Sequence, residues 1–382
     1  MKYICEYKIP VENKENRYFT LSSNDKLDYI LSAIFQVEKE IDIISPSHTL
    51  HCKGKFKSRK DRLNSNCFVV SGPTFGTHSA IGRMVHKCFT LLWLTIYLLV
   101  NCNRNETVFV YHSVFTILPL LIVKKIKKIK IVNEVEEIFY LLENKSTGWR
   151  CKLEKSIFRK SEAFIFASKQ LESICNKQSK AFIIANGNYS AVPKIIVENK
   201  DDEKIKIVYA GLIEKDKVAF KSVDIARYLP EDYEIHIIGY GKEDDVNYLI
   251  SYIQEVNQIS DCKVYYDGLK RGNEYTEYLQ GCCFGICPLT EDRNYQEVCF
   301  PSKITSYMKN GLHVVTTENQ VVRTSEYGPF ITYVPAESPL AFADVIKKLK
   351  IDELKDSRDV VAELNQRFMK DMVKFLYRIL ED

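Results

Sequence analysis

The chain has 382 residues, of which 46% are hydrophobic and 27% charged, and its formal net charge is +4. This length exceeds one ordinary hydrophobic core and predicts two domains of about 180 residues each. So small a net charge argues against a nucleic-acid partner, because such proteins carry a strong basic excess on one face.

The sequence holds 12 cysteines, and none of them forms a CxxC pair. The densest group, Cys282, Cys283 and Cys287, lies in an apolar, strand-like run, which favours buried thiols over a metal site. The first residues include the charged Glu6 and Lys8 and do not resemble a secretory signal. Many unpaired cysteines without such a signal indicate a reducing compartment, so we expect a cytoplasmic protein.

The N-terminal half predicts a Rossmann-like domain over residues 1–190. Its strand-like runs are Tyr3–Tyr7, Ile41–Ile44, Phe68–Ser71, Val108–Tyr111, Lys130–Asn133, Ala163–Ala167 and Ala181–Ile184. The helical segments between them include Asp25–Phe35, Ile81–Val100 and Cys151–Phe158. The polar and basic stretch 46–66 has no clear period and is expected to form a long loop.

Two segments of this half bear on membrane contact. The run Phe89–Val100 is apolar but has only twelve residues, whereas a spanning helix needs about 20, so we expect a helix buried on the sheet. Residues 124–130 hold five lysines. Two interpretations of these lysines stay open: a solvated helix end, or peripheral contact with anionic lipid on the inner face of the plasma membrane.

The C-terminal half predicts a second Rossmann-like domain over residues 200–355, after a polar boundary at 188–204. Its apolar runs suit a parallel sheet covered on both faces. They are Ile205–Tyr209, Glu234–Ile238, Cys262–Tyr266, Cys283–Cys287, His313–Thr316 and Phe330–Val334. An amphipathic helix over residues 356–382 is expected to close the chain. The predicted fold class is therefore α/β, with two tandem Rossmann-like domains facing a cleft.

The segment Phe300–Ile304 is the most informative part of the chain. Pro301 suits the start of a helix and Ser302 can cap or enter it, which leaves free backbone N–H groups at that end. Such an end binds anions, and Lys303 adds a full positive charge beside it. These residues predict a seat for a diphosphate, although the same pattern also fits an ordinary capped helix.

The sequence FPSKITSYMKNGLHVV resembles the donor-binding segment PSK…EYMAxGxPVV of retaining glycosyltransferases with the two-domain GT-B fold. The resemblance extends over most of the C-terminal half. Gly211 ends the first strand as in that family, and Lys217 stands where its phosphate-binding lysine falls. Gly239 and Gly241 resemble its GxG strand end, and Gly268 with Leu269 resembles the segment whose backbone meets the base. The resemblance thus implies that the donor is held by Gly211, Lys217, Gly239, Gly241, Gly268, Leu269, Pro301, Ser302, Lys303 and Ile304.

The sequence also departs from the family pattern. Leu212 replaces an arginine, and Val218 replaces the glycine that follows the phosphate-binding lysine. The two glutamates that the family carries eight residues apart fall on Val298 and Ser306. Because the second glutamate usually holds the ribose, Ser306 implies a different ribose contact.

In the N-terminal half, two residues at strand ends are candidates for catalysis. A similar histidine in related transferases lies at the sugar, which makes His112 the candidate for an active-site contact. Glu134 follows the next strand at the head of a group of carboxylates and is the candidate for an acceptor or sugar contact. For both residues a structural role in the fold stays open.

The resemblance implies a glycosyltransferase of the hexosyltransferase type (EC 2.4) that needs no metal and retains the anomeric configuration. We expect a UDP-sugar as the donor, with a GDP-sugar as the alternative. The expected acceptor is a saccharide, in particular a growing lipid-linked polysaccharide. Two other functions stay open, a nucleotide-sugar 2-epimerase of the same fold and an inactive nucleotide-sugar-binding partner.

Overall fold

The computed structural model describes residues 1–7, 17, 21–47, 49, 54–143, 147–195, 204–215, 217–288, 297–336 and 338–381. These residues form two compact units. Unit 1 consists of residues 1–188 together with 368–382, and unit 2 of residues 189–367.

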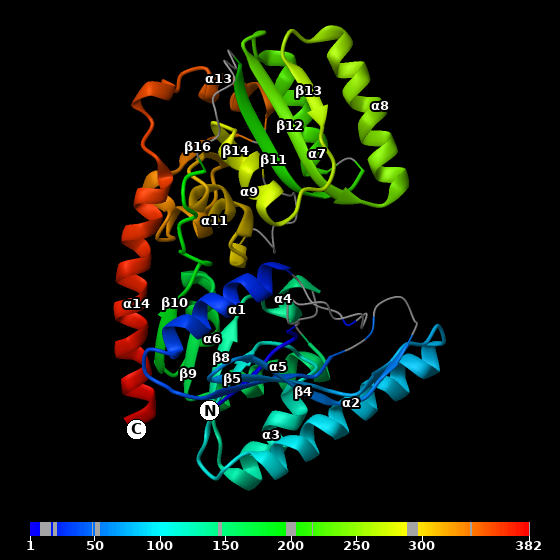
Figure 1. Ribbon diagram of the computed structural model, residues 1–382, viewed down its shortest axis with the longest axis vertical. Helices are drawn as coiled ribbons and strands as arrows, with labels where there is room; N and C mark the ends of the chain where they lie inside the picture. The colour runs from blue at the N-terminus through cyan, green and yellow to red at the C-terminus, as the bar shows by residue number, and fades with distance from the viewer. Residues whose placement is uncertain are drawn as a thin grey trace. The chain divides into compact units, whose positions relative to one another are not determined.

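Within the described residues, unit 1 contains an eight-stranded sheet in the order β10-β9-β8-β7-β1-β2-β5-β4 (Figure 1). Its strands are β1 (Lys2–Ile4), β2 (Ile41–Ser45), β4 (Arg59–Asn64), β5 (Cys67–Ser71), β7 (Thr107–Tyr111), β8 (Lys130–Val135), β9 (Ala163–Phe166) and β10 (Ala181–Ile184). All neighbouring strands are parallel except β4, which runs antiparallel to β5. The strand order reverses between β1 and β7, and ligands of such sheets bind at the carboxyl ends of strands beside this reversal.

The helices of unit 1 cover the sheet. They are α1 (Leu21–Ile34), α2 (Ala80–Asn101), α3 (Ile117–Lys127), α4 (Phe139–Leu142), α5 (Trp149–Lys160) and α6 (Lys169–Cys175). Right-handed crossovers place α1 on one face of the sheet and α2 and α3 on the other. The C-terminal helix α14 (Ser357–Glu381) ends in unit 1, where Phe368 stacks on Tyr29 of α1 at 5.2 Å between ring centroids.

The prediction that the apolar run Phe89–Val100 is buried was wrong. The run belongs to α2, and of the 22 residues of this helix only His86, Thr90, Leu94 and Leu98 are buried. These four recur at every fourth position and form one narrow stripe. The remaining apolar side chains therefore stay outside the core.

The prediction of a long loop at residues 46–66 was also wrong in part. Strand β4 lies within that stretch, and β3 (Lys55–Phe56) pairs there with β6 (Thr74–Phe75). Because β4 is a charged edge strand, its sequence shows no apolar alternation, and charges of this kind protect sheet edges against further pairing. One of these charges, the ammonium of Lys60, lies over the ring of Phe68 in β5, 4.3 Å from the ring centroid.

Unit 2 contains a six-stranded, wholly parallel sheet among its described residues, in the order β13-β12-β11-β14-β15-β16. Its strands are β11 (Ile205–Ile213), β12 (Tyr233–Gly241), β13 (Lys263–Tyr266), β14 (Phe284–Cys287), β15 (His313–Thr317) and β16 (Thr332–Val334). Its order reverses between β11 and β14, which makes their carboxyl ends the expected ligand edge.

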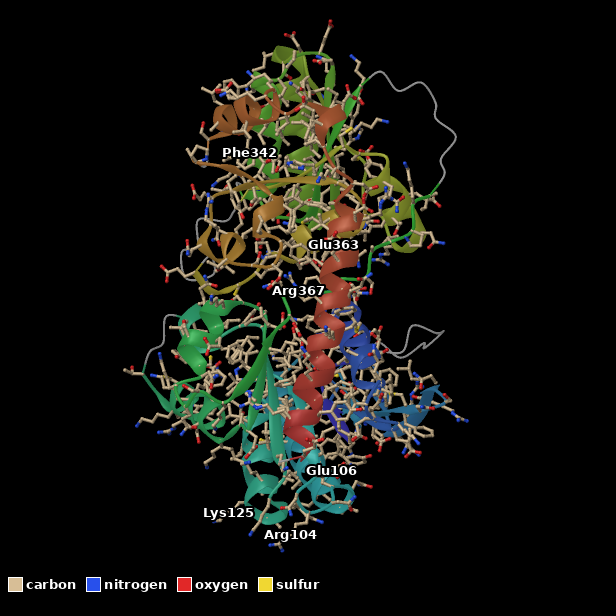
Figure 2. The ribbon with its side chains drawn as sticks, turned by 90° about the vertical axis from the view of Figure 1, so that its left-hand side faces the viewer. Arg104, Glu106, Lys125, Phe342, Glu363 and Arg367 are labelled. Carbon is tan, nitrogen blue, oxygen red and sulfur yellow. The ribbon has the colours of Figure 1, made fainter. Side chains whose placement is uncertain are left out.

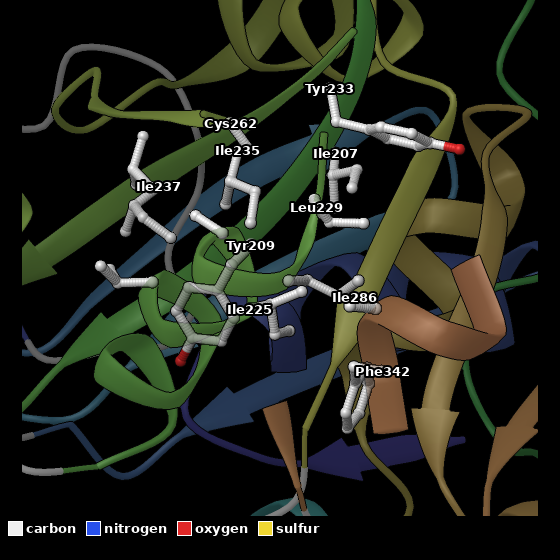
Figure 3. Packing of buried hydrophobic residues seen from close by; sticks show 14 of the residues in the cluster. Ile207, Tyr209, Ile225, Leu229, Tyr233, Ile235, Ile237, Cys262, Ile286 and Phe342 are labelled. Atoms are coloured by element: carbon white, nitrogen blue, oxygen red, sulfur yellow. The ribbon is translucent and has the colours of Figure 1, made fainter. Parts of the chain in front are cut away.

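Helices cover both faces of this sheet. They are α7 (Val218–Asp224), α8 (Glu243–Ile259), α9 (Gly272–Gln280), α11 (Ser302–Lys309), α12 (Gln320–Arg323) and α13 (Pro339–Ile346). On one face, Ile207, Ile235 and Ile286 of three neighbouring strands pack with Phe342 of α13 in a continuous apolar core (Figure 3). Two doubly wound units and a C-terminal helix confirm the predicted α/β class with two Rossmann-like domains.

Two strands of unit 2 extend beyond their predicted ends. Gly211 lies inside β11, which ends at Ile213, and β12 includes both Gly239 and Gly241. The two strands pair in register along this extension, with Gly211 opposite Gly239. The glycines are therefore part of the ladder and not of the loop after it.

Candidate functional site

The first candidate site lies at the carboxyl edge of the unit 2 sheet, around the start of α11. Pro301 is the residue that precedes this helix and Ser302 is its first, exposed residue, as expected. No side chain of the described residues caps this end. The amide of Ile304 donates to the carbonyl of Pro301 at 3.0 Å, and the Ile304 side chain is fully buried, so only its backbone can face a ligand.

Lys303 points from the first turn of α11 towards β11. Its Nζ donates to the hydroxyl of Tyr209 at 3.0 Å and lies 4.4 Å from the centroid of that ring. Its side chain fills the space beside Gly211, where an added Cβ would overlap it. Among the described residues no carboxylate lies within ion-pair distance of this partly buried ammonium. Within the described part of the chain, Lys303 therefore offers a positive charge that no carboxylate compensates, at an anion-binding helix end.

Tyr307 holds α11 in this position. Its hydroxyl accepts a hydrogen bond from the amide of Ala210 at 2.8 Å, and its ring packs over Gly285 so closely that a Cβ there would overlap it. The buried tyrosine thus connects α11 to both β11 and β14. This contact fixes the helix start at the reversal of the strand order.

The glycines of β11 and β12 allow the two strands to approach closely. Gly239 has φ +151°, and a Cβ on it would overlap the carbonyl oxygen of Gly211. A Cβ on Gly241 would likewise overlap the carbonyl oxygen of Ile213. The amide of Gly239 also donates to the carbonyl of Gly268 at 3.0 Å, which joins the two predicted glycine segments.

The segment of Gly268 and Leu269 rests on a polar cluster. Gly268 has φ +72° and open space around its Cα, and Leu269 is exposed. Asp267 accepts hydrogen bonds from His236 Nδ1 at 2.9 Å and from the hydroxyl of Tyr278. Burial raises the pKa of Asp267, but these two hydrogen bonds, together with the charge interactions with His236 and Lys270, outweigh burial and lower the pKa overall. The side chain of Asp267 thus ties the residue before this turn to His236 of β12 and Tyr278 of α9.

Three residues at positions of the donor pattern do not contact the start of α11 through an anion-binding group. Lys217 precedes α7 and pairs with Glu214, with 2.7 Å between Nζ and Oε2, and both side chains are exposed. Leu212, in place of the arginine, is 48% exposed. Ser306, in place of the glutamate, shares a 2.9 Å hydrogen bond with the hydroxyl of Tyr275. The structure therefore brings Lys303 to Gly211 and Gly239 to Gly268, whereas Lys217 is joined to neither pair.

The second candidate site lies in unit 1, at the carboxyl end of β8, which includes Glu134 instead of ending before it. Glu134 is 1% exposed, and its Oε2 accepts a hydrogen bond from the hydroxyl of Tyr3 in β1. Its Oε1 lies 3.8 Å from Nζ of Lys26, whose closer partner is Glu136. Burial raises the pKa of Glu134 to about 7, with Lys26 opposing the shift and Glu136 adding to it.

His112 follows β7 beside this cluster. Its amide donates to the carbonyl of Glu134 at 2.7 Å, so the two catalytic candidates are brought together by the β7–β8 ladder. The imidazole is 4% exposed, and its Nε2 lies 2.8 Å from Oε1 of the buried Glu154. Glu154 also accepts the amides of Phe139 and Tyr140 at 2.9 and 3.0 Å. The catalytic roles of His112 and Glu134 stay predictions.

Sequence reasoning missed Glu154, Tyr3 and Tyr209. Glu154 could have been found, because its spacing from Cys151 and Phe158 places it on the buried face of α5. Tyr3 and Tyr209 carry no such signal, since a tyrosine in a buried strand is ordinary core. Among the described residues, no group of three or more His, Cys, Asp or Glu side chains could hold a metal ion.

The raised pKa of Glu134 predicts how stability depends on pH. The folded chain keeps this proton up to about pH 7, whereas the unfolded chain loses it near 4.5. The carboxyl therefore lowers the free energy of unfolding increasingly as pH rises from 4.5 to 7. Glu134→Gln should remove this slope and raise the free energy of unfolding by up to about 3 kcal/mol above pH 7.

Tryptophan fluorescence in urea can measure this effect, because both tryptophans, Trp93 and Trp149, belong to unit 1. The exposed Glu40 of the same unit provides the control, and Glu40→Gln should keep the wild-type slope. A Glu134→Gln protein with the wild-type slope would contradict this assignment.

No protein-family model matches the sequence, and no curated protein matches it. Solved structures do match over the full chain. One, "Trehalose-6-phosphate from E. coli bound with UDP-2-fluoro glucose", has a TM-score of 0.71 at 8% identity and covers 100% of this chain and 98% of its own. The α,α-trehalose-phosphate synthase (UDP-forming) of Burkholderia xenovorans, in complex with glucose-6-phosphate, has a TM-score of 0.67 at 9% identity, with 100% of both chains covered. Anabaena HepE, in complex with UDP and glucose, has a TM-score of 0.58 at 10% identity and covers 100% and 98%.

The chain has the GT-B fold. This fold agrees with the one that the sequence resemblance implied, and at these identities the likeness to solved structures concerns the fold alone. Within this GT-B chain, the start of α11 lies at the reversal of strand order in unit 2, and Glu134 lies on the corresponding edge of unit 1.

Proposed function

We propose that the chain is a glycosyltransferase that moves a sugar from a nucleotide sugar, specifically a UDP-sugar, to a saccharide acceptor. The observation that carries this proposal is Lys303, an ammonium without a carboxylate partner among the described residues, at the open start of α11. A diphosphate supplies the missing negative charge, and the backbone amides at the helix start can donate to its oxygens.

The reaction breaks the bond between the anomeric carbon and the diphosphate oxygen. An acceptor hydroxyl oxygen forms the new bond to that carbon, and its proton passes to the released diphosphate. Lys303 and the start of α11 stabilise the charge that develops on this leaving group, which is the part that a metal ion plays in other transferases. We also propose that the anomeric configuration is retained, because the family that the sequence resembles retains it.

Unit 1 would then bind the acceptor, near His112 and Glu134. The acceptor that we propose is a lipid-linked saccharide of polysaccharide biosynthesis, met by a cytoplasmic protein at the inner face of the plasma membrane. The structures of similar fold that were solved with UDP-2-fluoroglucose, with UDP and glucose, or with glucose-6-phosphate support a UDP-sugar and a saccharide as the ligand classes.

Incubation with a panel of UDP-sugars and GDP-sugars, with and without saccharide acceptors, tests this function. We expect release of UDP from one donor, faster when an acceptor is present. Absence of release, together with no thermal shift from any donor, would sink the proposal. Epimerised donor without release would identify a 2-epimerase.

One observation favours a second candidate, a binding protein without transferase activity. Leu212 and Ser306 replace the two polar residues that the resemblance places at the phosphate and the ribose, and Ser306 bonds to Tyr275. In the same panel, this candidate predicts a thermal shift from a nucleotide sugar and no nucleoside diphosphate release under any condition.

A further inference from the structure

The outer face of α2 and α3 in unit 1 exposes more apolar surface than a water-facing surface usually does. Its large exposed side chains are Ile81, Met84, Val85, Phe89, Leu92, Ile96 and Val100 of α2 and Leu118, Ile122 and Ile126 of α3. We name these ten residues the α2–α3 face. Those of α2 recur at helical spacing opposite the buried stripe, and those of α3 recur at every fourth position. A contiguous patch of this kind marks a binding surface.

The two helices form one surface because they pack side by side on the same face of the sheet. A groove of ≈ 350 Å³ runs along α2. Its lining residues are Phe89, Leu92, Trp93, Ile96, Tyr97, Val100 and Asn101. Trp93 stacks on Tyr97 at 5.3 Å between centroids. Aromatic side chains of these two types concentrate where a bilayer meets water.

The charges around the α2–α3 face are mostly positive. Residues 80–130 hold eight lysines and arginines and one acidic residue, Glu106. Glu106 is already bound by Lys2 at 2.8 Å. Lys125 and Lys128 are exposed and, like Arg104, have no ion-pair partner among the described residues. Figure 2 shows Lys125 and Arg104 at the same end of unit 1, where the amide of Asn105 donates to the carbonyl of Lys127 at 3.0 Å.

We infer that the α2–α3 face lies on an anionic lipid bilayer, with α2 in the plane of the membrane. An apolar helix face beside unpaired lysines is the chemistry by which monotopic helices bind such membranes. A second copy of this chain would bring the same basic residues together without acidic partners, so charge complementarity favours lipid. This inference rests on the proposed function in one respect only: the proposed lipid-linked acceptor gives the chain a reason to be at a membrane.

Alpha-helix α2 is also long and apolar enough to cross a membrane, as judged by length and composition. Spanning would break its attachment to the unit. His86 bonds to the hydroxyl of Thr74 at 2.9 Å, and the Trp93 ring packs so closely on Gly72 that a Cβ there would overlap it. Arg83 and Lys87 would also enter the hydrocarbon region. The in-plane arrangement keeps all of these contacts.

Sedimentation of the full chain with vesicles of phosphatidylcholine, with and without phosphatidylglycerol, tests this surface. We expect binding only when phosphatidylglycerol is present. Leu92→Glu with Ile96→Glu should abolish binding, because both side chains are more than half exposed and no core contact is lost. Ile259→Glu with Leu340→Glu changes two exposed apolar residues of unit 2 and should bind as wild type does.

A second pair of variants tests the charge. Lys125→Glu with Lys128→Glu should weaken vesicle binding by about tenfold or more, because each lysine near an anionic surface contributes about fivefold. Lys348→Glu with Lys350→Glu makes the same change of net charge on unit 2 and should have little effect.

Four results would overturn the inference. The first two are that the wild-type chain binds neither vesicle, or that the Leu92→Glu, Ile96→Glu protein binds as strongly as wild type. The third is a dimer that forms without lipid and that this variant abolishes. The fourth is that the bound chain resists extraction with alkaline carbonate, which would indicate a spanning helix. None of these assays uses nucleotide, so failure here is distinguishable from failure of UDP release.

Discussion

Replacement of Gly239 by alanine is expected to lower the free energy of unfolding of unit 2 by about 4 kcal/mol or more. The added Cβ would overlap the carbonyl oxygen of Gly211 on the paired strand, and φ is +151° at this position. Neither group can move alone, since both belong to the β11–β12 ladder. Because folded domains are stable by only about 5–15 kcal/mol, unit 2 should lose most of its stability and its nucleotide site.

Hydrogen exchange measured on peptides of β11 and β12 is the suitable readout, because both tryptophans belong to unit 1 and their fluorescence would miss unit 2. Gly268→Ala is the matched control. Gly268 also has positive φ, +72°, but no atom lies within 4 Å of the added Cβ, so only backbone strain of about 1–2 kcal/mol is expected. Equal effects of the two changes would show that the close approach of the strands is not what requires glycine at 239.

Replacement of Lys303 by methionine is expected to raise the dissociation constant for UDP by about tenfold to a hundredfold. Charged hydrogen bonds contribute about 1.5–3 kcal/mol, which corresponds to that range. Methionine keeps the apolar stem that packs beside Gly211 and removes only the ammonium. Since this ammonium has no carboxylate partner among the described residues, stability without nucleotide should be unchanged or higher.

Lys217→Met separates the two lysines of the donor pattern. Lys217 is exposed and already pairs with Glu214, so its removal should raise the dissociation constant less than about threefold. Titration calorimetry with UDP measures both variants, and thermal unfolding without UDP controls for damage to the fold. If Lys217→Met weakens UDP binding more than Lys303→Met does, the phosphates lie elsewhere.

Much of the fold could be predicted because the strands of both units are short apolar runs with helices between them. The start of α11 was predicted as well, since a proline followed by Ser302 and Lys303 is a local signal. The burial of α2 was predicted wrongly, because an apolar helix on a sheet and an apolar helix on a membrane have the same composition. Strand β4 was missed since a charged edge strand carries no apolar period.

The contacts that build the candidate sites could not be predicted in the same way. The bond of Lys303 to Tyr209 joins residues 94 positions apart, and that of Tyr3 to Glu134 joins residues 131 apart. Such pairs form only when particular strands become neighbours, and the strand order that makes them neighbours is known only from the structure. The environment of Lys217 could not be predicted either, because Lys217 forms an ion pair with Glu214 and the family pattern does not include this pair.

The most direct test of the central claim is an experimental structure of the full chain with UDP. We predict that diphosphate oxygens lie within hydrogen-bond distance of Lys303 Nζ and of the amides at the start of α11. The base should lie against the backbone of Gly268 and Leu269. UDP bound away from α11, or a site at α11 that stays empty at saturating UDP, would contradict the claim.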